Sequence, residues 1–388
     1  MFNEDDKLVG FCSCGADAQV AGGDYNEEAL DVGMMIEGVT ITNIKITEGV
    51  NHMQIDQEFR EGAHNAIRTC MNIGPGDRVY IISDEETLLV GQALQEESVA
   101  AGAEAKLIRL EDFGPRPLRN VPEGFIENLL TLDPTVTFFA ASAKEGELPL
   151  RMQMSIQLAQ QAQKIRHGHM VSVTPQIMRE GMRADYRQIH DLTMRVYEMA
   201  RKAQTITVTS PKGSKFSAQF SPELKWIPCH GLYHKPGDWG NLPEGEVFTC
   251  PATLNGIIVA DMLGDYFSDR YGLLKSPVTF DVKDGYVQSI QCDDKGIEKE
   301  LWDYLTSDEN GRRVGEFAIG TNTALTALSG VLLQDEKIPG IHIAFGNPLP
   351  RQTGADWTAS THIDVIPTDC TITLDDTVIM RDGKFTFE

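Results

Sequence analysis

The sequence predicts an α/β domain with a parallel sheet over residues 1–204, followed by a β-rich α+β domain over residues 205–388. Three observations lead to this prediction. The length of 388 residues exceeds the usual size of a single core. Between about residues 60 and 180, apolar runs typical of strands alternate with helical runs, a pattern that favours a parallel sheet flanked by helices. After about residue 203, helical texture largely gives way to short strands and turns.

The first half begins its regular pattern with a helical run from about Gly62, then the turn GPGD and the strand RVYIIS at 78–83. Apolar residues recur at helical spacing over 87–103, and the apolar run AKLIRL follows, which completes a β-α-β unit. No glycine-rich phosphate loop is found in this half, so a nucleotide role has little support and a scaffold or lid is expected. Its later elements are a strand at 136–141, a helix at 148–168, a strand at 169–173 and a helix at 185–203.

The second half consists mainly of short apolar runs separated by turns. Lys283-Asp-Gly and Arg381-Asp-Gly lie between alternating runs, which is a strong hairpin signal. One helix, GIEKELWDYLT, interrupts the strands. The predicted strands cover residues 205–211, 215–221, 246–252, 256–262, 277–292 and 371–388.

Composition narrows the range of partners. The chain carries 57 acidic and 34 basic residues, a formal net charge of −23, which disfavours binding to nucleic acid or to an anionic membrane. The N-terminus is acidic, unlike a signal peptide, and no apolar stretch of about 18 residues occurs, so a cytoplasmic protein is expected. The seven scattered cysteines are typical of reduced thiols, and Cys12 and Cys14 lack the second pair that a metal site would need.

Four strand-like segments of the second half carry acidic or imidazole groups in apolar surroundings. They are NLPEGEVFTCP with Glu246, RRVGEFAIGTN with Glu316, GIHIAFGNP with His342, and STHIDVIP with His362 and Asp364. Burying a carboxylate costs several kcal/mol unless it is paired or bound to metal. Each residue alone could equally be a hydrogen-bonding group, but together they predict a site for zinc, manganese, cobalt or iron(II). Their spacing leaves open whether one ion binds or two.

These motifs, in this order, resemble the metal-binding motifs of the thermophilic metallo-aminopeptidases, the family of aminopeptidases T and S. The upstream segments GPGDRVYIISDEE and AAGAEAKLIRL resemble the N-terminal domain of that family. The resemblance implies a two-domain homodimer that hydrolyses N-terminal residues of peptides with a metal-activated water. It also implies two divalent ions (zinc, cobalt or manganese) held by Glu246, Glu316, His342, His362 and Asp364.

Two departures from that family stand out. The family has a tyrosine seven residues after the histidine matched by His342, where this chain has Leu349, so an oxyanion-stabilising phenol is missing unless Tyr233, Tyr266 or Tyr271 replaces it. The segment CHGLYHKPGDWG is rich in His, Tyr and Trp and resembles a substrate wall, to which His230 and His234 would contribute. Glu244, two residues before Glu246, is a candidate catalytic base.

A second reading belongs to another reaction class. The fold also resembles that of ring-cleaving dihydroxypyridine dioxygenases, which hold one iron(II) with two histidines and one aspartate, and His342, His362 and Asp364 could supply this triad. The missing tyrosine fits the dioxygenase, whereas the retained Glu246 and Glu316 favour the two-metal peptidase. We therefore expect a peptidase first, a dioxygenase second, and a metal-binding protein without turnover third.

Overall fold

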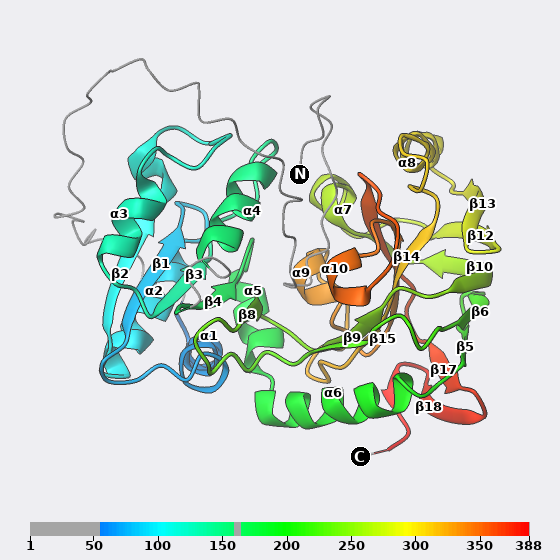
Figure 1. Cartoon of the computed structure of the whole chain (residues 1–388), viewed down its shortest axis with the longest axis horizontal. Coiled ribbons are helices and arrows are strands. Elements are labelled where there is room, and N and C mark those ends of the chain that lie inside the picture. Colours follow the sequence, from blue (N-terminus) through cyan, green and yellow to red (C-terminus); the bar gives the residue numbers. More distant parts are fainter. Residues whose placement is uncertain (1–54, 159–163, 388) are drawn as a thin grey trace.

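The structure is a computed structural model that describes residues 55–158 and 164–387 (Figure 1). Its N-terminal part contains a five-stranded parallel sheet in the order β2-β1-β3-β4-β8. Helix α2 packs against β1 and β2, as the alternating pattern predicted for a helix that flanks such a sheet. Helix α1 in turn packs against α2 and α5. The strands are β1 (Arg78–Ser83), β2 (Glu104–Arg109), β3 (Val136–Phe139), β4 (Arg166–His169) and β8 (Trp239–Asn241).

The helical segments of this part largely follow the predicted order. Helix α6 matches the predicted helix at 185–203, and its N-cap Asp185 accepts hydrogen bonds from the backbone N–H groups of Arg187 and Gln188. The segments are α1 (Gln57–His64), η2 (Asn65–Cys70), α2 (Leu88–Ala100), η3 (Leu110–Phe113), α3 (Phe125–Thr131), α4 (Leu148–Ile156), α5 (Pro175–Arg179), η5 (Gly181–Arg183) and α6 (Tyr186–Ala200).

The fourth strand corrects the prediction. Residues 166–168 were assigned to a helix and 169–173 to the strand, but β4 covers Arg166–His169 and the strand ends there. Its register is set by neighbours distant in sequence: the Arg166 guanidinium pairs with Asp77, and His167 Nδ1 lies 2.8 Å from Thr137 Oγ1. Sequence periodicity does not contain these contacts. Part of the predicted helix, residues 159–163, and the Cys12 and Cys14 pair lie outside the described residues.

The fifth strand comes from the predicted second domain. Residues Trp239–Asn241, expected in the loop CHGLYHKPGDWG, form β8 and pair in parallel with β4. The chain therefore returns to the N-terminal sheet after it has formed its first C-terminal strands, at residues 205–209, 215–219 and 227–229. The domain boundary at residue 204 stays a prediction.

The C-terminal part contains two antiparallel sheets. An eight-stranded sheet has the order β13-β12-β10-β6-β5-β17-β18-β19, and both predicted hairpins belong to it, with Asp284 and Asp382 at positive φ in their turns. Its strands are β5 (Thr205–Thr209), β6 (Lys215–Gln219), β10 (Thr253–Ala260), β12 (Val278–Lys283), β13 (Tyr286–Gln291), β17 (Thr371–Leu374), β18 (Thr377–Arg381) and β19 (Lys384–Phe385).

A six-stranded sheet has the order β11-β16-β15-β14-β9-β7 and is packed on one face against the eight-stranded sheet. Phe317, Ile343 and Val365 lie on this packed face and share one core with Ile206 and Phe280 of the other sheet. Its strands are β7 (Ile227–Cys229), β9 (Glu246–Thr249), β11 (Met262–Leu263), β14 (Val314–Gly320), β15 (Gly340–Gly346) and β16 (His362–Ile366). The helices of this part are α7 (Asp265–Tyr271), α8 (Lys295–Thr306), α9 (Leu332–Asp335) and α10 (Pro350–Thr353).

The coarse fold class is thus confirmed: a mixed α/β chain with a parallel sheet and large antiparallel sheets. Within the described residues, no helix is both long and apolar enough to cross a membrane.

Candidate metal centre

The five predicted donors lie on one face of the six-stranded sheet, opposite its apolar core. They come from four neighbouring strands, β9, β14, β15 and β16. Because side chains of a strand alternate between faces, the apolar residues between the donors point into the core and the donors point away from it. In the register, Ala344 is paired with Glu316 on one side and with Asp364 on the other, so two carboxylates flank a small residue. All five donors are buried.

Two histidines and two carboxylates form a closed ring of contacts. His342 Nε2 lies 3.5 Å from Glu316 Oε1 and 3.8 Å from Asp364 Oδ1. His362 Nε2 lies 3.7 Å from Glu316 Oε2 and 3.5 Å from Asp364 Oδ2. Glu246 joins from the side, with Oε2 3.6 Å from His342 Nε2.

The other nitrogen of each imidazole is held by a backbone carbonyl. His342 Nδ1 lies 3.0 Å from the carbonyl oxygen of Glu336, and His362 Nδ1 lies 2.9 Å from that of Asn347. A carbonyl only accepts hydrogen bonds, so each Nδ1 carries the proton. This directs each Nε2 at the carboxylates, where its lone pair can bind a metal ion that takes the place of a second proton, the arrangement that metal-binding histidines use.

The donor set fits a divalent cation. Within the described residues, the carboxylate oxygens of Glu316 and Asp364 are buried and accept no hydrogen bond, since the imidazole nitrogens that face them lie 3.5 to 3.8 Å away. Burial raises the pKa of Glu316. Although burial alone would lower the pKa of His342, the carboxylates of Glu316, Glu246 and Asp364 raise it to about 9. The site therefore attracts positive charge, which a metal ion would supply.

Donor spacing supports the same fit. Donors about 2.1 Å from a tetrahedral ion lie about 3.4 Å apart. The four ring contacts of 3.5 to 3.8 Å are close to that separation. Two groups of three donors share Asp364: one with Glu316 and His362, the other with Glu336 and His342. The distances among these imidazole nitrogens and carboxylate oxygens are thus compatible with one ion or with two.

A buried lysine beside the ring was missed in the sequence. The ammonium of Lys337, whose side chain has 0% exposure, lies 2.6 Å from Glu336 Oε1, 2.7 Å from Glu246 Oε1 and 3.2 Å from Glu244 Oε1. Burial would lower the pKa of Lys337, but these carboxylates raise it well above its usual value. In the sequence, QDEKIPG looks like a solvated turn before a strand. The one available signal was a lysine three residues before the strand-like run GIHIAFG.

Gly320 explains how this lysine reaches the sheet. A Cβ at position 320 would lie 1.9 Å from the carbonyl oxygen of Ile338 and 2.9 Å from the carbonyl carbon of Lys337. Only glycine allows so close an approach of another backbone. Gly320 is also the register partner of Glu246, so the approaching segment brings Lys337 over that carboxylate.

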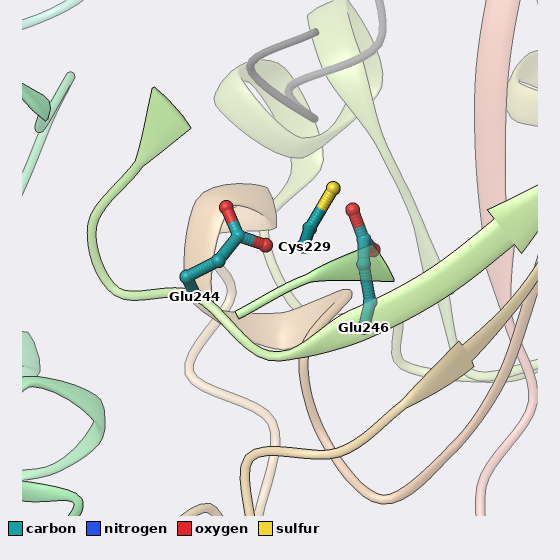
Figure 2. A group of neighbouring side chains, drawn as sticks. All are labelled: Cys229, Glu244 and Glu246. Atoms are coloured by element: carbon teal, nitrogen blue, oxygen red, sulfur yellow. The ribbon is translucent and has the colours of Figure 1, made fainter. Parts of the chain in front are cut away.

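Glu244, the candidate base, faces the same lysine. Cys229, Glu244 and Glu246 direct their sulfur and carboxylate groups toward one another, with donor atoms within 4.8 Å (Figure 2). Burial raises the pKa of Glu244 to about 7, although Lys337 acts to lower it. Tyr233 donates its hydroxyl hydrogen to the Asn241 carbonyl at 3.0 Å and lies 3.5 Å from Glu244 Oε2. A catalytic role for Glu244 stays a prediction.

The remaining predicted residues lie elsewhere. The His230 ring packs edge-on against His190 with centroids 4.8 Å apart, and His234 Nε2 lies 2.8 Å from the Thr69 carbonyl oxygen. Their contacts are with the N-terminal helices rather than with the ring of donors, and substrate binding by them stays a prediction. Leu349 packs against Phe248 and Ala318.

Of the three tyrosines that could have replaced the missing phenol, two lie on the surface. Tyr266 and Tyr271 both direct their hydroxyls to Glu300. The third, Tyr233, reaches Glu244 instead of the ring of histidines and carboxylates.

Two solved structures have a fold similar to that of this chain. The structure is similar to that of 2,5-dihydroxypyridine dioxygenase from Pseudomonas putida KT2440, with a TM-score of 0.61, 16% identity and coverage of 88% of this chain and 99% of that one. It is also similar to the aminopeptidase AmpT from Thermus thermophilus, with a TM-score of 0.59, 17% identity and coverage of 85% and 99%. No curated protein matches the chain significantly. Both neighbours are enzymes.

A family model identifies the family. The model of 2,5-dihydroxypyridine 5,6-dioxygenase matches residues 63–387, and the chain belongs to that family. The resemblance to aminopeptidases T and S is therefore supported for the fold only, and the second expectation from the sequence is favoured over the first.

Proposed function

We propose that this protein is an iron(II)-dependent dioxygenase that opens a dihydroxylated, nitrogen-containing aromatic ring. His342, His362 and Asp364 would hold the iron. The observation that carries the proposal is the convergence of these three side chains in a chain of this family. Both imidazole Nε2 atoms lie within 3.8 Å of the Asp364 carboxylate. Two histidines and one carboxylate on a single centre are the donor set that non-haem iron(II) oxygenases use.

When bound, iron(II) would supply the redox chemistry and the open coordination positions that an oxygenase needs. The chain itself orients the donors, since the carbonyls of Glu336 and Asn347 fix the two imidazoles. Burial of the donors keeps bulk water away from them. Glu244, with a pKa raised to about 7, is suited to accept a proton from a ring hydroxyl near neutral pH.

A two-metal aminopeptidase is the second candidate, and one observation favours it. Glu246 and Glu316 are both retained, and each has an oxygen within 3.6 Å of His342 Nε2. Against it, Leu349 occupies the position of the family tyrosine and is packed into an apolar cluster with Phe248. The oxyanion-stabilising phenol of the peptidase therefore has no counterpart at this position.

The test compares both reactions on one preparation. The protein is purified without metal and loaded anaerobically with iron(II), manganese, cobalt or zinc. Oxygen uptake and loss of ring absorbance are then followed with 2,5-dihydroxypyridine and related dihydroxylated N-heteroaromatics, and leucine-anilide hydrolysis is measured in parallel. We expect ring loss with one oxygen molecule consumed per ring, with iron(II) only.

A matched pair of variants links activity to the triad. His362→Asn should lose at least about 100-fold in activity at fixed iron, whereas His64→Asn, at an exposed position on α1, should retain it. Anilide hydrolysis with manganese, cobalt or zinc, without ring loss, would replace the proposal by the peptidase. The homodimer and the cytoplasmic location stay predictions, of which light scattering tests the first.

A further inference from the structure

We propose that Lys337 is a built-in counter-cation that restricts the centre to one metal ion. Its ammonium fills the position, between Glu244, Glu246 and Glu336, that a second ion would need. The inference rests on the single metal of the proposed function and names the residue that enforces it.

The contacts of the ammonium support this role. Three carboxylates approach Nζ at 2.6, 2.7 and 3.2 Å, and all four side chains have at most 1% exposure. A buried ammonium is stable only when carboxylates compensate it, and buried carboxylates need a cation in return. One lysine here performs the neutralisation that a divalent ion would otherwise perform.

The possible metal positions divide according to this lysine. Three groups of donors in the described residues could each hold an ion. The group of Cys229, Glu244 and Glu246 contains two carboxylates in contact with Lys337, and the group of Glu336, His342 and Asp364 contains one. The group of Glu316, His362 and Asp364 has no residue in contact with the ammonium, and His342 lies 3.5 Å from its Glu316. The single ion therefore belongs at this third group, where His342 Nε2, 3.8 Å from Asp364 Oδ1, completes the set of two histidines and one aspartate.

The backbone holds the lysine in place. The Lys337 carbonyl accepts a hydrogen bond from Asn322 N at 2.9 Å, and Lys337 N donates to the Gln334 carbonyl at 3.0 Å. Gly320 allows the adjoining Ile338 carbonyl to lie against the sheet. These contacts fix the backbone from which the buried side chain extends toward the three carboxylates.

Glu246 consequently has a different role from the one expected. Its Oε1 lies 2.7 Å from Lys337 Nζ and its Oε2 lies 3.6 Å from His342 Nε2. It thus joins the lysine to the ring of donors. In this proposal, Glu246 neutralises Lys337 rather than completing a second metal site.

The test measures how many Mn²⁺ ions bind per chain. Full-length wild-type protein is stripped of metal and titrated with Mn²⁺, and bound ions per chain are measured by elemental analysis after gel filtration. Electron paramagnetic resonance then distinguishes an isolated ion from an exchange-coupled pair. We expect one ion per chain with the hyperfine pattern of an isolated ion, and two ions in wild type would overturn the inference.

Two variants test the lysine itself. Lys337→Met removes the ammonium, and Lys337→Met/Glu336→Gln removes one charge of each sign while it keeps Cys229, Glu244 and Glu246. We expect both to bind two ions per chain and to gain thermal stability when Mn²⁺ is added. Lys295→Met, at a surface pair on α8, is the matched control and should stay at one ion.

Each outcome decides the matter. A folded variant that still binds one ion overturns the inference, as does failure of both variants to fold even with Mn²⁺, because a second cation should replace the ammonium. Failure of the inference and failure of the proposed function can be told apart. One ion without ring cleavage leaves the inference intact and removes the function, whereas two ions with ring cleavage do the opposite.

Discussion

Both parts of the chain bury carboxylates, but they neutralise them differently. In the N-terminal part, Arg116 lies between Asp84 and Glu147, with Nη1 2.9 Å from Asp84 Oδ2 and Nη2 2.5 Å from Glu147 Oε2. The backbone N–H groups of Thr87 and Ser142 also donate to Asp84, at 2.8 and 2.7 Å. Although burial raises the pKa of Asp84, these hydrogen bonds lower it below its usual value. This cluster is complete within the protein.

In the C-terminal ring, by contrast, the described residues supply no hydrogen bonds to the buried carboxylates. The oxygens of Glu316 and Asp364 face two imidazoles and, among the described residues, receive no hydrogen bond. Burial raises the pKa of Glu316. The comparison teaches that burial of acidic residues does not mark a site by itself. A metal site is marked instead by buried carboxylates whose oxygens receive no hydrogen bond from the protein.

The largest effect should come from breaking the complete cluster. Arg116→Met leaves Asp84 and Glu147 buried without their cation, so the free energy of unfolding should fall by about 3–5 kcal/mol. Urea denaturation measures the loss. Bound metal per folded chain should stay at the wild-type level, and a drop there would show that the two clusters are coupled.

A smaller effect should follow from removing one donor of the ring. His362→Ala should weaken metal binding at least about 100-fold. At an ion concentration about 100 times the wild-type Kd, the variant should therefore lack at least about 2.3 kcal/mol of metal-dependent stabilisation. Chelation should lower the Tm of wild type and leave that of the variant nearly unchanged. Equal Tm shifts on chelation in both proteins would contradict the assignment of His362.

The pH dependence of stability should separate the two parts further. Burial lowers the pKa of His167 in β4 to about 3 from an ordinary value of 6.5, so its neutral form is the one that folds. Its contribution is fully present above about pH 6.5 and is lost as pH falls from there toward 3.

The variant His167→Asn tests this contribution. Between pH 6 and 4, its unfolding free energy should fall less steeply than that of wild type, by up to about 1.4 kcal/mol per pH unit. Urea denaturation at several pH values measures the slope, with His64→Asn as the exposed control. Identical slopes in His167→Asn and wild type would argue against a buried neutral imidazole.

The smallest effect should come from the core face directly behind the ring. Ile363 lies between His362 and Asp364 and points into the core shared by the two antiparallel sheets. Ile363→Val should cost about 1 kcal/mol of unfolding free energy with unchanged metal affinity. Isothermal titration would detect a change in affinity, which would mean that packing behind the strand sets the geometry of the donors.

The sequence by itself determined the coarse fold and the five candidate donors. Alternation with a period of two is a local property, so Glu246, Glu316, His342, His362 and Asp364 could each be assigned to the polar face of an apolar strand. Hairpins with Asp-Gly turns are local in the same sense, and both were predicted correctly.

Tertiary structure alone decided what lies around those donors. Lys337 is buried because Gly320, 17 positions earlier, admits the backbone of the next turn, and no pattern around Lys337 encodes that approach. The strand β8 and the register of β4 likewise depend on partners far along the chain. Contacts between distant segments set which buried charges are neutralised by the protein and which are left for a metal ion, and local periodicity contains no record of them.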